Sequence, residues 1–177
     1  MKDTWHLDFI FQLASIVRPK VYVELGIQYC ANFNRMIDYA DQLIGIDIAH
    51  QAGEYMSKSG KVQFFHGTSA DFAKRLQAQP LQIDMLFIDA DHSKEAVLED
   101  FRLLFPYVVP HGIVLFHDSH PDNESKVRPD WCGTVYQAIE ELAKDTSEYE
   151  LVTIPVTPGL TICRKRRQQL SWQEKQR

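Results

Sequence analysis

A chain of 177 residues with 45% apolar content leaves room for one compact domain. Its formal net charge of −5 argues against a general nucleic-acid or membrane-surface binder. No apolar stretch approaches the roughly 18 residues that span a bilayer, and the N-terminus lacks the apolar core of a signal peptide. Because the three cysteines show no metal-type spacing and an odd number cannot all pair, we expect reduced thiols in a soluble, cytoplasmic protein.

The first half of the chain alternates between apolar runs of strand length and segments with helical spacing. Apolar residues recur at helical intervals over residues 5–17, and Arg18-Pro19 then ends the helix. We next expect strands at 21–25, 43–48, 62–65 and 83–88, and between them a helical segment through 33–40, a weak helix or loop at 51–59 and a helix at 69–78. Alternation of this kind predicts a parallel sheet.

The second half continues the alternation and ends in a hairpin. We expect a helix at 93–107, a strand at 113–116, a helix at 134–144, and strands at 149–154 and 160–163. The link between the last two strands is too short for a helical crossover, so the last strand is predicted to be antiparallel. The prediction is an α/β fold with a doubly wound, mostly parallel seven-stranded sheet, an antiparallel last strand and helices on both faces. Residues 1–167 are taken as one domain and 168–177 as a polar tail, and the basic run at 164–167 is interpreted as solvated.

Acidic residues stand directly after two of the predicted strands. The strand at 83–88 runs into Asp89, and the strand at 113–116 runs into His117 and Asp118. Parallel strands joined by helices end at the same edge of a sheet, so the two carboxylates should lie on one rim. In open α/β sheets this rim is where ligands bind.

The earlier strand ends indicate a ligand that carries a ribose. Gly26 permits a tight turn into the next segment, where free backbone N–H groups favour an anionic group. Asp47 follows the second strand about twenty residues later and is placed to accept hydrogen bonds from ribose hydroxyls, or alternatively to cap a loop. The dinucleotide fingerprint is absent because residues 26–31 contain a single glycine, which makes a nicotinamide-dependent oxidoreductase the poorest hypothesis.

Together these segments resemble the class I S-adenosylmethionine-dependent methyltransferases, and among them the small O-methyltransferases of the catechol and caffeoyl-coenzyme A types. The resemblance covers roughly residues 20–163. It lies in five stretches, namely 23–26, 45–47, 66–69, 84–93 and 110–118. The resemblance implies a Rossmann-like fold and S-adenosylmethionine as the cofactor.

The resemblance also implies roles for individual residues. The cofactor-binding set would be Glu24 and Gly26 at the methionine part, Asp47 at the ribose, Thr68 and Ser69 beside the adenine, and Asp89 facing the methyl-transfer site. In metal-dependent members, carboxylates at the positions of Asp89 and Asp118 hold a divalent ion, usually Mg²⁺, and Ser119 would complete the metal set in this chain. Such an ion would activate the substrate hydroxyl.

The chain departs from the family pattern at three positions. Cys30 replaces an often-found second glycine, His92 replaces the lysine common in metal-dependent relatives, and Ser119 replaces an asparagine. We interpret His92 as a general base, because its ordinary pKa suits proton removal near neutral pH. The alternative is a helix-start residue that only bonds a neighbouring carboxylate.

A rival hypothesis is a transition-metal site built from imidazoles. Its ligands would be His117, Asp118 and His120. We rank it lower because strand alternation would turn His117 away from Asp118.

The sequence thus predicts an O-methyltransferase for a small-molecule acceptor, with His92 and Asp89 as catalytic residues and with or without a divalent ion. The loop at 119–133 is expected to select the acceptor, with Arg128 and Trp131 as contacts or with Trp131 only anchoring the loop. Glu99 and Asp100 are taken as solvated positions of a helix. The alternative function is a catalytically silent cofactor-binding domain that acts through a partner. The open rim is also compatible with a homodimer that completes the pocket.

Overall fold

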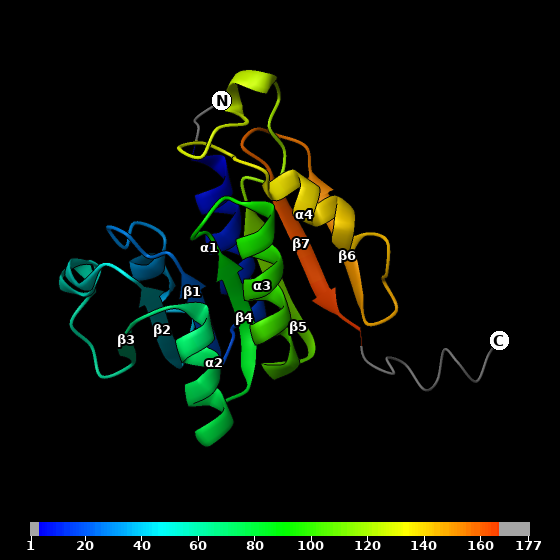
Figure 1. Cartoon of the computed structure of the whole chain (residues 1–177). Coiled ribbons are helices and arrows are strands. Elements are labelled where there is room, and N and C mark those ends of the chain that lie inside the picture. The colour runs from blue at the N-terminus through cyan, green and yellow to red at the C-terminus, as the bar shows by residue number, and fades with distance from the viewer. Residues whose placement is uncertain (1–3, 167–177) are drawn as a thin grey trace.

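One seven-stranded sheet organises residues 4–166, the part of the chain that the computed structural model describes. Figure 1 shows the strands in the order β3-β2-β1-β4-β5-β7-β6. Their bounds are β1 Val21–Leu25, β2 Gln42–Asp47, β3 Val62–His66, β4 Ile83–Ile88, β5 Val108–His117, β6 Tyr149–Ile154 and β7 Leu160–Lys165. Strands β1 to β5 pair in parallel, whereas β7 is antiparallel to both of its neighbours. The predicted fold class is confirmed, while the predicted tail at 168–177 lies outside the described residues.

Helices cover both faces of the sheet. Helices α2 (Ser69–Ala78), α3 (Lys94–Leu104) and α4 (Val135–Leu142) lie on one face, and α1 (Trp5–Val17) lies on the other (Figure 1). The core is accordingly divided in two: Leu86 packs in the cluster beneath α2, α3 and α4, and its neighbour Phe87 packs in the cluster beneath α1. Successive side chains of a strand point to opposite faces, so a strand covered on both sides is apolar throughout. None of the helices in residues 4–166 is long and apolar enough to cross a bilayer.

Three predicted elements differ most from their bounds in the structure. The helical segment expected through 33–40 is only a short 3₁₀ helix, η1 (Phe33–Met36). The helix expected at 93–107 ends at Leu104 and continues as the 3₁₀ turn η3 (Phe105–Tyr107), which contains Pro106. Strand β5 begins at Val108, five residues earlier than expected. Two further 3₁₀ helices lie in loops, η2 at His50–Tyr55 and η4 at Glu124–Lys126.

The first two residues of the basic run at 164–167 belong to strand β7 and are not part of a solvated tail. Arg164 pairs with Glu150 on the adjacent strand, and Lys165 donates through Nζ to the carbonyls of Phe105 and Val108. These partners hold both residues in β7, which corrects the interpretation for 164 and 165. Arg167 lies outside the described residues.

The ligand-binding rim is formed by helix starts that have side-chain caps. Thr68 and Asp71 form a capping box at the start of α2, and Ser93 accepts the backbone N–H of Ala96 at the start of α3. Such caps satisfy free N–H groups and fix where the chain enters the helix. They therefore position the residues that follow β3 and β4.

Candidate active site

A cavity of about 330 Å³ lies at the carboxyl ends of the parallel strands. It is lined by residues that follow β1, β2, β3 and β4, together with two residues of α3. Five of the six predicted cofactor-binding residues line it, namely Gly26, Asp47, Thr68, Ser69 and Asp89. The topology therefore brings most of the predicted set together.

Glu24 is not among the residues that line the cavity. Its side chain is buried, and its carboxyl accepts hydrogen bonds from the Tyr22 hydroxyl at 2.5 Å and the Asn32 amide at 2.8 Å. Burial raises the pKa of Glu24 to about 8, although the two hydrogen bonds oppose this rise. Tyr22 and Glu24 share one face of β1 because strand side chains alternate, and this places the carboxyl in the core beneath α1.

Asp47 is held in place by the backbone around it. One of its carboxylate oxygens accepts the N–H of Gln28 at 3.0 Å, and the other accepts the N–H of Ala49 at 2.8 Å. Asp47 therefore caps the loop with its carboxylate and also lines the cavity. Each carboxylate oxygen has a second lone pair, so Asp47 can still accept hydrogen bonds from a bound ligand.

The turn after β1 depends on Gly26 and Cys30. A Cβ on Gly26 would lie 2.1 Å from the carbonyl oxygen of Asp89, so only glycine fits where the ends of β1 and β4 meet. Cys30 has a φ of 58°, in the left-handed region that favours glycine, and its side chain is buried in the core. The cysteine therefore keeps the backbone shape of a glycine and adds no side chain to the cavity lining.

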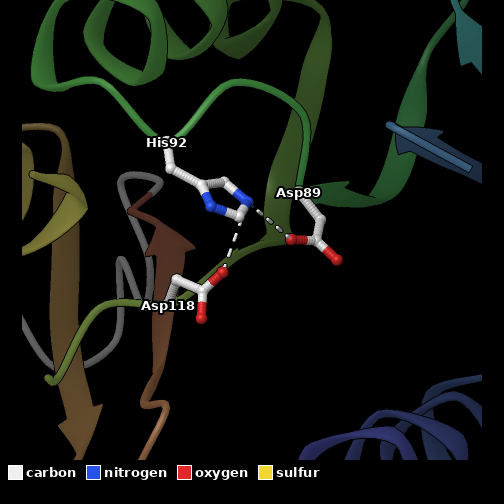
Figure 2. Close-up of side chains that lie close together, drawn as sticks. All are labelled: Asp89, His92 and Asp118. Carbon is white, nitrogen blue, oxygen red and sulfur yellow. Dashed lines mark ion pairs between the residues drawn. The ribbon is translucent and has the colours of Figure 1, made fainter. Parts of the chain in front are cut away.

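Figure 2 shows a cluster of two carboxylates and an imidazole beside this cavity. His92 points between Asp89 and Asp118: its Nε2 lies 3.3 Å from Asp118 Oδ2 and 3.7 Å from Asp89 Oδ1. His117 approaches the same two oxygens, with its Nδ1 2.9 Å from Asp89 Oδ1 and 3.1 Å from Asp118 Oδ2. Each of these carboxylate oxygens thus faces two imidazole nitrogens.

The position of His117 corrects the expectation that it turns away from Asp118. Asp118 has a φ of 56°, so the chain leaves the extended conformation at this residue and its carboxylate turns back towards His117. Sequence reasoning missed His117 as a member of the main cluster because strict alternation was assumed to continue. The signal was the His-Asp pair at the strand end, where alternation no longer holds.

The charges of the cluster are strongly coupled. Burial opposes ionisation of Asp89, but the charge and hydrogen bond of His117, with a further hydrogen bond from His92, lower its pKa to about 2. Burial alone would lower the pKa of His117, yet the two carboxylates raise it to about 10. The hydrogen bond to Asp89 raises the pKa of His92, and the charge of Asp118 adds to this effect. We infer that His117 stays protonated and neutralises part of the charge of the two carboxylates.

The loop between β5 and α4 closes over His92. Nδ1 of His92 bonds to the carbonyl oxygen of Trp131, and the backbone N–H of Thr134 donates to the carbonyl of His92 at 2.8 Å. A Cβ on Gly133 would lie 2.2 Å from that same carbonyl, so glycine allows the close approach. Since a carbonyl only accepts, Nδ1 carries a proton and Nε2 is the nitrogen free to gain or lose one.

A second cavity of about 500 Å³ lies on the other side of His92. It shares Gln28, Ala90 and Asp91 with the first cavity, and Arg128 lines it while pairing with Asp130 at 3.0 Å. The indole of Trp131 is not among the lining residues; it is half-exposed and faces Lys126, whose Nζ lies 5.6 Å from the ring centroid. The structure therefore favours Arg128, and not the Trp131 ring, as a wall of this cavity.

Two of the three predicted metal-binding residues, Asp89 and Asp118, form a mixed oxygen and nitrogen cluster with His92, which was not predicted as a metal ligand. In the described part of the chain, Asp89, His92 and Asp118 place ligand atoms within 4.8 Å of one another. Ser119 is buried, and its hydroxyl has no hydrogen-bond partner among residues 4–166. His120, a ligand of the rival transition-metal hypothesis, lines a separate cavity beside α4.

A magnesium ion fits this arrangement poorly. Mg²⁺ prefers six oxygen ligands in octahedral geometry and keeps several waters. Here the carboxylate oxygens that would face the ion already contact Nδ1 of His117 and Nε2 of His92. The residues present therefore do not fit the Mg²⁺ expected from the resemblance.

S-adenosylmethionine, in contrast, fits the first cavity. Asp47 offers its remaining lone pairs to hydroxyl groups, and Ile48 and Ala96 provide apolar walls for a planar base. Asp89 connects this cavity to the histidine cluster. The residues present thus match a ligand that carries a ribose and a base and that ends near His92.

Comparisons with known proteins agree with this geometry. A methyltransferase domain family matches residues 23–119, more than half of the chain. The chain belongs to this family. This methyltransferase is also 31% identical to an uncharacterised protein of Acanthamoeba polyphaga mimivirus. The match covers 89% of this chain and 79% of the viral protein. The prediction of an S-adenosylmethionine-dependent methyltransferase is confirmed.

Other relatives of this methyltransferase are O-methyltransferases. It is 26% identical to the rhamnosyl O-methyltransferase of Mycobacterium tuberculosis over 79% of its own length, but it spans only 60% of the mycobacterial protein. An O-methyltransferase from Bacillus cereus in complex with SAH superposes with a TM-score of 0.76 at 12% identity, covering 92% of this chain and 81% of the other. The O-methyltransferase TomG from Streptomyces achromogenes, in complex with SAM, superposes with a TM-score of 0.74 at 17% identity. This superposition covers 92% of this chain and 80% of TomG. At these identities the structures support the fold alone.

Proposed function

We propose that this methyltransferase moves the methyl group of S-adenosylmethionine to a hydroxyl of a small molecule that binds beside His92. The observation that carries the proposal is the position of His92. It stands on the wall of the second cavity and contacts Asp89, which lines the first. Residues on this boundary can act on a donor from one cavity and an acceptor from the other.

The proposed chemistry is a displacement at carbon. S-adenosylmethionine, when bound, supplies a methyl group on a positively charged sulfur. The acceptor oxygen forms a bond to this carbon while the carbon–sulfur bond breaks, and the hydroxyl proton passes to Nε2 of His92. The carboxylates of Asp89 and Asp118 stabilise the imidazolium that results, because both lie within 4 Å of Nε2.

The lining of the second cavity favours an acceptor rich in hydroxyl groups. The cavity is bordered by polar and charged groups such as Asp91, Ser93, Arg128 and Asp130, and it has no Phe, Tyr or Trp side chain among its described lining residues. A planar catechol would find no Phe, Tyr or Trp ring to stack on, whereas a sugar would find hydrogen-bond partners on several sides. The name of the mycobacterial relative, a rhamnosyl O-methyltransferase, supports the same choice. We therefore propose a glycosyl hydroxyl as the acceptor.

The test is a methyl-transfer assay with methyl-labelled S-adenosylmethionine. Deoxyhexose glycosides and catechols serve as acceptors, each with and without a chelator. We expect transfer to a glycoside that persists in chelator.

His92→Gln should lower turnover by roughly 10²- to 10⁴-fold, the usual contribution of a general base, while calorimetric binding of S-adenosylhomocysteine stays unchanged. His66→Gln is the matched control, since His66 lies at the end of β3 and is not among the lining residues of either cavity.

Two outcomes would contradict the proposal. If His92→Gln and the unchanged protein have equal turnover, His92 is not the general base. Binding of S-adenosylhomocysteine without transfer to any acceptor would favour the catalytically silent domain instead. The homodimer expected from the open rim stays a prediction, which light scattering after size-exclusion chromatography can check.

A further inference from the structure

Asp100 is a buried carboxylate on the wall of the cofactor cavity. It lies on α3 and is only 8% exposed, so the expectation of a solvated helix position is wrong for this residue. Its neighbour Glu99 is exposed, as expected. Ala96 and Asp100 are four residues apart, share one face of the helix and both line the cavity. Sequence reasoning missed this residue, although its spacing from Ala96 was visible.

The carboxylate of Asp100 has little to bond to within the protein. The Ser69 hydroxyl is the one group that favours its charged form, and no ion pair to it occurs among residues 4–166. Burial raises the pKa of Asp100 to about 6, while the bond to Ser69 opposes the rise. A buried carboxylate is costly unless donors satisfy it. A donor on a ligand in the cavity would satisfy it.

The place of Asp100 in the cavity limits what that donor can be. Ser69 and Asp100 both line the first cavity, and Ser69 begins α2, so the carboxylate lies near the turn from β3 into α2, the part of the cavity that the family resemblance gives to the adenine. The ribose partner Asp47 and the methyl-transfer residue Asp89 belong to the ends of other strands. The adenine base carries one exocyclic amine, which donates hydrogen bonds and accepts none well.

We propose that Asp100 selects the adenine base of the cofactor by accepting a hydrogen bond from its exocyclic amine. The inference rests on the proposed function, because it assumes that the first cavity binds S-adenosylmethionine. A deaminated base carries a carbonyl oxygen at the same position. Two acceptors would then face each other in a buried site, which disfavours the analogue.

The experiment compares S-adenosylhomocysteine with S-inosylhomocysteine, which carries a carbonyl in place of the exocyclic amine and a proton on the neighbouring ring nitrogen N1. Binding is measured by calorimetry at pH 7.5, where Asp100 is ionised, for the unchanged protein, Asp100→Asn and Asp100→Ala. The unchanged protein should prefer the adenosyl ligand by roughly 10- to 100-fold, as expected for one hydrogen bond to a charged group. Asp100→Asn should narrow or invert the preference for the adenosyl ligand, because the asparagine amide can donate to the carbonyl of the inosyl ligand. Asp100→Ala should remove most of this preference.

Glu99→Gln is the matched control, since Glu99 is the exposed carboxylate next to Asp100 on the same helix. Its ligand preference should equal that of the unchanged protein. Thermal melts identify the variants that fold. If both folded Asp100 variants keep the preference of the unchanged protein for the adenosyl ligand, the inference is overturned while the proposed function stands. Failure of the unchanged protein to bind S-adenosylhomocysteine would overturn the proposed function and this inference with it.

Discussion

Glu24 gives the clearest test of how burial controls charge in this protein. Its carboxyl lies in the core with a pKa of about 8, against an ordinary value of 4.5. Between these two values the folded protein keeps the proton and the unfolded chain releases it. The free energy of unfolding should therefore fall as pH rises from about 4.5 to about 8.

The size of the effect follows from the shift. Each pH unit in this window corresponds to about 1.4 kcal/mol, so burial of Glu24 costs about 3 kcal/mol by pH 7 relative to pH 4.5. Glu24→Gln keeps the shape of the side chain and removes the titration. The variant should gain stability over the unchanged protein as pH rises, by about 3 kcal/mol at pH 7.

Urea unfolding followed by circular dichroism at pH 5, 6, 7 and 8 measures this difference. Glu99→Gln removes an exposed carboxylate and is the matched control. A flat difference for Glu24→Gln would refute the reasoning, because it would mean that Glu24 is ionised in the folded state. Affinity for S-adenosylhomocysteine should change little in Glu24→Gln, since Glu24 is not among the residues that line the cavity; a large loss would restore Glu24 as a cofactor contact.

Three further substitutions test the site. Asp47→Ala should weaken S-adenosylhomocysteine binding roughly ten-fold or more in calorimetry, as charged hydrogen bonds are lost, and unchanged affinity would exclude the ribose contact. His117→Gln removes the positive charge that faces the half-buried carboxylate of Asp89 and the buried carboxylate of Asp118, and it should lower the free energy of unfolding by about 3 kcal/mol, whereas a neutral effect in urea titration would argue against a protonated imidazole. Gly133→Ala places a Cβ against the carbonyl of His92 and should reduce turnover at least about ten-fold with cofactor binding kept; Gly60→Ala, with nothing within 4 Å of its added Cβ, should leave turnover unchanged.

The sequence by itself determined the sheet and its rim. Strands covered on both faces must be apolar throughout, so runs such as 83–88 were visible as strands without any structure. The short link before Leu160 required an antiparallel hairpin. Gly26, Asp47 at the end of β2 and Asp89 after β4 then placed the cofactor cavity, because parallel strands end on one edge.

Only the tertiary structure decided which side chains face the site. Strand alternation sends Glu24 into the core, and a left-handed backbone at Asp118 brings its carboxylate to His117. The burial of Asp100 depends on the packing of α3 over the turn at Ser69, which involves residues far apart in the chain. Periodicity gives the face of an element, but the direction and charge of a single side chain depend on the neighbours that the fold places around it.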